Sequence, residues 1–89
     1  MTKYVTIDCA PMVGTDEVHD IFARELDFPA YYGRNLDALY DLLSTCPPTV
    51  LTLANASALK EMFRYGDNLR LALEDAEKDN PNLTLIFED

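Results

Sequence analysis

Three short apolar segments, widely spaced along the chain, limit its possible folds more than any other feature. They are Lys3–Asp8 (KYVTID), Thr49–Leu53 (TVLTL) and Leu83–Phe87 (LTLIF), and each is rich in the β-branched or large apolar residues typical of strands. The connections between them are far too long for hairpin turns. Parallel strands, by contrast, require crossovers of a dozen or more residues, which are usually helical. The sequence therefore predicts an α/β fold with a small three-stranded parallel sheet packed against helices.

The connecting segments carry helical patterns. Thr15 is a predicted N-cap, and apolar residues at helical spacing follow it to about Leu26. In the second connection, a short amphipathic segment is expected to stop at Gly66. A longer helix, with Asp67 or Asn68 as its predicted cap, then leads to the last strand. With one further helix in the first connection, described below, the predicted order is β-α-α-β-α-α-β.

The length and charge of the chain restrict its domain count and its partners. With 89 residues, a single domain covering 1–89 is expected. The formal net charge of −9 repels nucleic acid and anionic membrane surfaces and attracts basic proteins, although solubility alone also explains such a charge. The sequence has no apolar run of transmembrane length and no signal-peptide core. We therefore expect a cytoplasmic protein whose Cys9 and Cys46 are reduced thiols.

Few residues support catalysis or the binding of a cofactor. His19 is the one histidine of the chain, and we expect it on the solvated face of its helix. The sequence contains no phosphate-binding glycine loop and no metal-binding motif, so no catalytic residue, metal or cofactor is predicted. One enzymatic alternative remains open. Asp37 and Asp41 could act as an acid–base pair, or hold a divalent ion, in a small hydrolase.

The stretch FPAYYGRNLDALYDLLSTC (residues 28–46) predicts a helix with two distinct faces. Asn35 is its N-cap, and the helix must end before Pro47. The apolar stripe consists of Leu36, Leu39, Tyr40 and Leu43, at i, i+3, i+4 and i+7. Asp37 and Asp41 lie about 100° and 140° around the helix from the first leucine, on a separate face.

The two aspartates allow two interpretations. Carboxylates beside an aromatic ring form a good surface for arginine or lysine, because they bind a guanidinium in bidentate fashion while the ring stacks on it. Equally, Asp37 suits the positive end of the helix dipole, and Asp41 could be solvated or paired with Arg34. The spacing by itself does not distinguish a binding face from a solvated face.

The stretch PAYYGRNLDALYDLL also resembles the signature of the barstar family, the intracellular inhibitors of barnase-type ribonucleases. The match comprises a Pro, one residue, Tyr-Tyr-Gly, and then Asn-Leu-Asp-Ala-Leu, an aromatic and Asp. The resemblance implies a three-stranded parallel sheet packed with helices. It also implies a non-enzymatic inhibitor whose second helix and preceding loop block the active site of a ribonuclease.

The resemblance assigns roles to individual residues. Asp41 would mimic the RNA phosphate at the centre of the interface, Asp37 would pair with a second basic group, and Tyr31 would stack on the catalytic histidine of the enzyme. The other residues implied at the partner-binding site are Asn35, Leu36, Ala38, Tyr40, Ser44, Thr45 and Asp75.

The chain departs from the family pattern at the edge of this site. Tyr40 and Cys46 stand where the family has tryptophans, and Asp75 replaces a glutamate. The leading hypothesis is an inhibitor that forms a 1:1 complex with a basic extracellular-type ribonuclease or ribonuclease toxin domain. The alternative keeps the fold but makes the chain an interaction module for a different basic protein.

Overall fold

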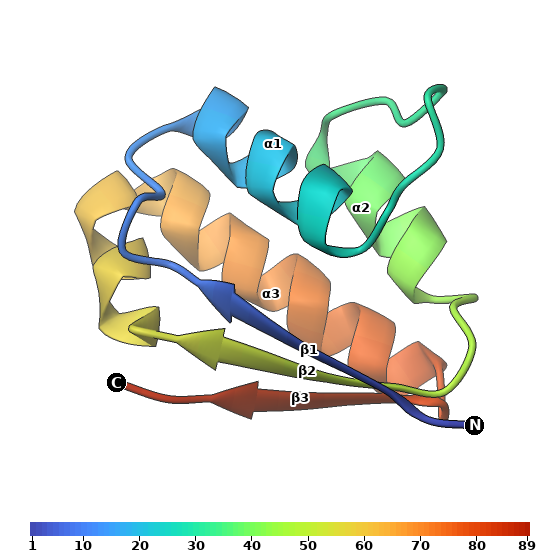
Figure 1. Ribbon diagram of the computed structural model, residues 1–89. Coiled ribbons are helices and arrows are strands. Elements are labelled where there is room, and N and C mark those ends of the chain that lie inside the picture. The colour runs from blue at the N-terminus through green and yellow to red at the C-terminus, as the bar shows by residue number, and fades with distance from the viewer.

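The three predicted strands form one parallel sheet (Figure 1). The computed structural model describes residues 1–89. Strands β1 (Lys3–Asp8), β2 (Thr49–Ala54) and β3 (Leu83–Phe87) lie in the order β1-β2-β3, and the pairing is parallel throughout. Leu51 in the central strand pairs with Val5 on one side and Leu85 on the other. The predicted sheet is confirmed.

The helices form a layer on one face of this sheet (Figure 1). They are α1 (Thr15–Glu25), α2 (Leu36–Leu43), the 3₁₀ helix η1 (Ala56–Met62) and α3 (Arg64–Asp79). Helix α1 contacts β1, α3 contacts β3 and η1, and α2 packs against α3. The order is β-α-α-β-α-α-β, as predicted, with a 3₁₀ helix as the third helical element.

Side chains alternate across the sheet, and only one face is fully covered. Val5 and Ile7 of β1 and Leu51 and Leu53 of β2 point into the core beneath the helices. Tyr4, on the opposite face, remains 77% exposed. The core between the two layers is thus apolar and one-sided, as the period of two along a strand requires. None of the helices is both long and apolar enough to cross a membrane.

The start of α1 differs from the sequence prediction. The N-cap residue is Gly14, and Thr15 is already the first helical residue. Gly14 has an extended backbone and makes no side-chain cap, so the prediction of Thr15 as the cap was wrong by one position. The first turn still carries Asp16 and Glu17, which suit the positive end of the helix dipole.

The junction between η1 and α3 also differs from the prediction. The chain turns at Phe63, whose φ of 52° lies in the left-handed region, and α3 begins at Arg64. Gly66 therefore lies inside α3 and does not stop the preceding segment. A Cβ at this position would lie 1.8 Å from the carbonyl oxygen of Leu59. The glycine is needed for close packing of two helical elements, a contact that local sequence does not reveal.

Candidate functional site

Helix α2 presents the two faces that its sequence predicts. Leu39 and Leu43 are buried in the core, and Leu36 is half-buried against it. Asp37 and Asp41 are exposed on the outer side. Since the leucines of α2 are buried and its two aspartates are exposed, the acidic face of the helix is turned toward solvent.

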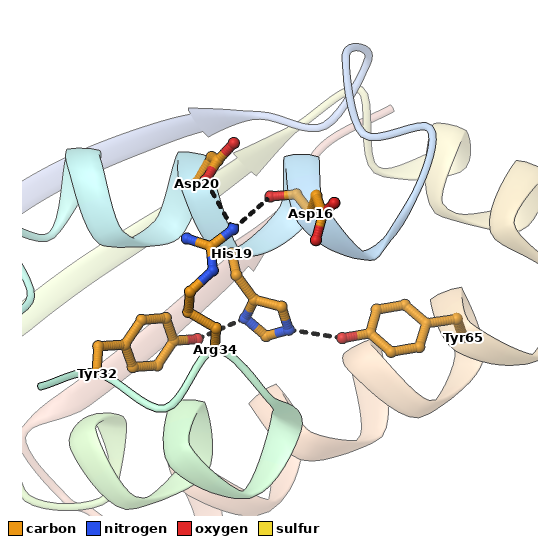
Figure 2. A network of polar contacts seen from close by, with 6 residues as sticks. All are labelled: Asp16, His19, Asp20, Tyr32, Arg34 and Tyr65. Carbon is orange, nitrogen blue, oxygen red and sulfur yellow. Dashed lines mark hydrogen bonds and ion pairs between the residues drawn. The ribbon is translucent and has the colours of Figure 1, made fainter.

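Hydrogen bonds and an ion pair hold the loop before α2 in place. The Asn35 side chain accepts a hydrogen bond of 2.8 Å from the Ala38 amide, which confirms it as the N-cap, and donates one to the Gly33 carbonyl. Arg34, with a φ of 55°, turns its guanidinium toward α1 (Figure 2). There it lies 2.8 Å from the Asp20 carboxylate and also donates to the Asp16 carbonyl. Arg34 is therefore paired with α1 and not with Asp41.

A hollow of about 190 Å³ opens where this loop meets α2. Tyr31 forms one wall and is 82% exposed, and Asp41 lies at the same opening. The lining residues are Tyr31, Tyr32, Gly33, Ala38, Asp41 and Leu42. The structure thus brings together Tyr31, Ala38 and Asp41 from the predicted set. It adds Tyr32, Gly33 and Leu42, which the motif contains but to which the sequence interpretation gave no role.

Tyr40 lies at the centre of a group of carboxylates contributed by α2 and α3. Its hydroxyl donates a hydrogen bond to Asp79. This bond, followed by desolvation and the charges of Asp79, Asp75 and Asp41, raises the pKa of Tyr40 above its usual value. Asp41, Asp75 and Asp79 therefore all lie close enough to the Tyr40 hydroxyl to act on it. A signal for Asp79 was present in the sequence, because it follows Asp75 at i+4 on the same helix.

No lysine or arginine of the protein forms an ion pair with the carboxylates around this site. We call Asp37, Asp41, Asp75 and Asp79 the acidic surface. The ion pairs of the chain are Arg24–Glu25, Arg34–Asp20 and Arg70–Glu74, and none of them includes a member of the acidic surface. No group of three or more His, Cys, Asp or Glu side chains is arranged to hold a metal ion. The acidic surface can therefore accept cationic groups from outside.

The remaining predicted residues lie at the C-terminal end of α2. The hydroxyls of Ser44 and Thr45 both donate to the Asp41 carbonyl, at 3.0 and 3.2 Å. They satisfy an oxygen that the end of the helix would otherwise leave unpaired. Cys46 follows as a half-buried free thiol, and Asn80 donates to its carbonyl. These contacts fix the end of α2 and the backbone of Asp41.

The prediction for His19 was wrong. The side chain is fully buried, with Nδ1 2.6 Å from the Tyr32 hydroxyl and Nε2 2.6 Å from the Tyr65 hydroxyl (Figure 2). Burial, together with the positive charge of Arg34, lowers its pKa. The apolar stripe of α1 faces the sheet, but α1 is also covered on its other side by the loop before α2 and by α3. The spacing of apolar residues along α1 does not predict this second contact, because other segments of the chain make it.

Comparison with known proteins identifies a family. A family model described as "Barstar (barnase inhibitor)" matches residues 2–88. The chain is also 33% identical, over 80 residues, to a Bacillus subtilis (strain 168) protein named "Putative ribonuclease inhibitor YrdF"; the match covers 86% of this chain and 88% of that protein. With the three-stranded parallel sheet and the exposed acidic helix, these matches show that the chain belongs to the barstar family.

Proposed function

We propose that this protein inhibits a basic ribonuclease of the barnase type by placing its acidic surface in the active site of the enzyme, in a 1:1 complex. The observation that carries the proposal is the position of Asp41. It is exposed, it lies at the opening of the hollow beside α2, and no ion pair within the protein engages it. Asp41 would take the place of an RNA phosphate.

The chemistry of ribonucleases supports this assignment. An enzyme that cleaves RNA gathers cationic groups around the reacting phosphate, because they stabilise its negative charge. A carboxylate held on a rigid helix can offer its oxygens to the same groups without first breaking an internal ion pair. Asp37, one helical turn away from Asp41, would engage a second basic group. Asp75 and Asp79 would extend the contact onto α3.

The hollow supplies a place for a planar group beside Asp41. Tyr31 exposes most of its ring, and Gly33 and Ala38 leave room next to it. An imidazole or guanidinium of the enzyme can stack on the tyrosine while it donates to the carboxylate. This arrangement supports the role that the family resemblance gives to Tyr31.

The net charge supports fast association. A protein with a charge of −9 attracts a basic enzyme over long distances, and salt screens this attraction. Inhibition of this kind would protect the cell that makes the ribonuclease, so we place the protein in the cytoplasm as an immunity protein. The two free thiols, Cys9 and Cys46, are compatible with a reducing compartment.

The test compares two variants of equal charge. Asp41→Asn removes the charge from the proposed phosphate mimic and keeps its shape. Glu61→Gln removes one exposed charge on η1, which contacts the opposite end of α3. Binding to a barnase-type ribonuclease is measured by calorimetry, and RNA cleavage is followed in parallel at low and moderate salt.

We expect tight 1:1 binding by the wild type and loss of cleavage. Asp41→Asn should weaken binding by roughly 100-fold or more, because it leaves a buried cation of the enzyme unpaired. Glu61→Gln should change affinity by no more than about threefold, mainly at low salt. Wild-type affinity for Asp41→Asn would refute the phosphate-mimic mechanism. A wild type that inhibits no guanyl-specific ribonuclease would favour the alternative, an interaction module for another basic protein.

A further inference from the structure

A buried polar network connects three elements of the helical layer. His19 of α1 lies between Tyr32, in the loop before α2, and Tyr65, in the first turns of α3 (Figure 2). Both ring nitrogens of His19 are within 2.6 Å of a tyrosine hydroxyl. His19 is fully buried, and Tyr32 is 8% exposed. No catalytic role uses this network, so its presence in the core calls for another explanation.

The protonation state of the ring determines the direction of its hydrogen bonds. A neutral imidazole has one donor nitrogen and one acceptor nitrogen. One tyrosine hydroxyl must then donate to the ring, and the other must accept from it. In the protonated ring both nitrogens donate, so the hydroxyl that donated must rotate and lose its acceptor. The network therefore has two distinct arrangements, selected by a single proton.

The network is connected directly to the candidate binding face. Tyr32 lines the hollow beside Asp41, and its neighbours in the chain are Tyr31 and Gly33, which line it too. The ring of Phe28 packs on Tyr32 with the ring centroids 4.7 Å apart. The next attachment of the loop is Arg34, which is paired with Asp20. Tyr32 and Arg34 thus both fasten the loop to α1.

We propose that His19 is a positioning residue for the binding face: by holding Tyr32 against Tyr65, it keeps Tyr31 and Gly33 in the arrangement that receives the partner, and a proton on its ring releases them. The identity of the partner rests on the function proposed above. The connection between His19 and the loop does not depend on that function.

The charges around His19 favour the neutral ring. Desolvation lowers its pKa first, and the positive charge of Arg34 adds to this effect. Asp16 and Asp20 on α1 oppose the shift, but Arg34 pairs with Asp20. From α3 the ring meets only the neutral hydroxyl of Tyr65, whose pKa is raised by burial.

The sign of the pH effect follows from this shift. The unfolded chain binds a proton near the ordinary value of 6.5, whereas the folded protein binds it only at lower pH. The ordered arrangement is therefore fully stable above pH 6.5 and is weakened as the pH falls below that value.

The first test uses the free protein, so it does not depend on the partner. Amide chemical shifts of Tyr31 and Gly33 are followed by NMR from pH 8 to 4.5, together with the ring nitrogens of His19. We expect the loop amides to titrate with the midpoint of the His19 ring. This transition should be absent in His19→Gln, whose amide offers one donor and one acceptor at every pH.

Two tyrosine variants separate positioning from general destabilisation. Tyr65→Phe removes the hydroxyl on the far side of His19, at a residue that does not line the hollow. Tyr4→Phe makes the same chemical change on the exposed face of the sheet and serves as the control. Tyr65→Phe at pH 7.5 should shift the amides of Tyr31 and Gly33, and Tyr4→Phe should leave them unchanged.

The binding arm uses a barnase-type ribonuclease at a temperature where all variants are fully folded. Tyr65→Phe should weaken binding about threefold to tenfold, the value of one hydrogen bond, and Tyr4→Phe should not. Ionisable groups of the ribonuclease also change binding with pH, and they do so equally for every variant. The difference between the wild-type and His19→Gln pH profiles therefore isolates the contribution of His19.

Loop amides that ignore both the His19 titration and the loss of the Tyr65 hydroxyl would overturn the proposal. Equal ribonuclease affinity for Tyr65→Phe and the wild type would do so as well. If the wild type binds no ribonuclease, the proposed function fails, and the NMR result alone decides the role of His19. If His19→Gln does not fold, Tyr65→Phe provides the same test with a smaller change.

Discussion

Substitution of Gly66 by alanine tests the close contact between η1 and α3. Alanine favours a helix interior over glycine by about 1 kcal/mol, so propensity alone predicts a more stable protein. The structure predicts the opposite. The new Cβ would lie 1.8 Å from the Leu59 carbonyl oxygen and 2.8 Å from its carbon, and both are backbone atoms.

The size of the expected effect follows from these distances. Carbon atoms and their neighbours pack at roughly 3.5 Å, so α3 and η1 must move apart by more than 1 Å along this contact. Overpacking of a core typically costs about 1–3 kcal/mol, and a backbone neighbour that cannot rotate away places Gly66→Ala at or above the upper end of that range. After subtraction of the gain in propensity, we expect a net loss of about 2 kcal/mol or more.

Urea unfolding monitored by circular dichroism measures this loss directly. A loss of about 2 kcal/mol lowers the unfolding midpoint by roughly 1 M urea, for slopes of about 1–3 kcal/mol/M. Asn68→Ala is the matched control, because this exposed residue of α3 gains helix propensity without a close contact. It should raise stability by a few tenths of a kcal/mol. If Gly66→Ala is as stable as the wild type, the contact yields easily and the packing argument is refuted.

Three further predictions concern capping, a buried amide and a thiol. Asn35→Ala should cost about 1 kcal/mol, since it removes the N-cap of α2, and Asn35→Asp should restore most of that stability; an equally stable alanine variant would show that the cap contributes nothing. Asn80→Ala should cost about 2–3 kcal/mol in urea unfolding, because it removes hydrogen bonds to two backbone carbonyls at and just beyond the end of α2, whereas the exposed Asn82→Ala should change little. Burial raises the pKa of the Cys9 thiol from 9.0 to about 11, so the folded state holds this proton more tightly than the unfolded chain. The free energy of unfolding should fall as the pH rises above 9.0. If Cys9→Ala lost as much stability as the wild type between pH 9.0 and 10, the Cys9 thiol would not be the cause of that loss.

Much of the fold could be predicted because its signals are local. The period of two and the β-branched content of KYVTID place β1 at Lys3–Asp8, where the structure has it. The i, i+3, i+4, i+7 stripe of α2 is likewise complete within eight residues. Parallel pairing followed from the length of the connections, since crossovers of this length exclude hairpins.

The prediction that Gly66 ends a helix failed because the deciding contact lies between two different elements, η1 and α3. Gly66 has the typical sequence signature of a helix stop, but its function is to let α3 approach Leu59. The turn that separates η1 from α3 lies instead at Phe63, a residue that rarely adopts a positive φ.

Part of the candidate site could likewise be predicted from the sequence, and part depended on tertiary packing. The sequence by itself determined that Asp37 and Asp41 share an exposed face of α2, because the helical repeat fixes their angles relative to the leucines. The i+4 spacing puts Asp79 on the same face of α3 as Asp75, but only the tertiary structure decided that this face meets α2, where the Asp79 carboxylate accepts from the Tyr40 hydroxyl. The packing of α1 against the loop and α3 likewise buried His19 beside Tyr32, 13 residues away, and Tyr65, 46 residues away. Local periodicity determines the face of the helix on which a side chain lies. The residues that this side chain contacts depend on packing between elements that are far apart in the chain.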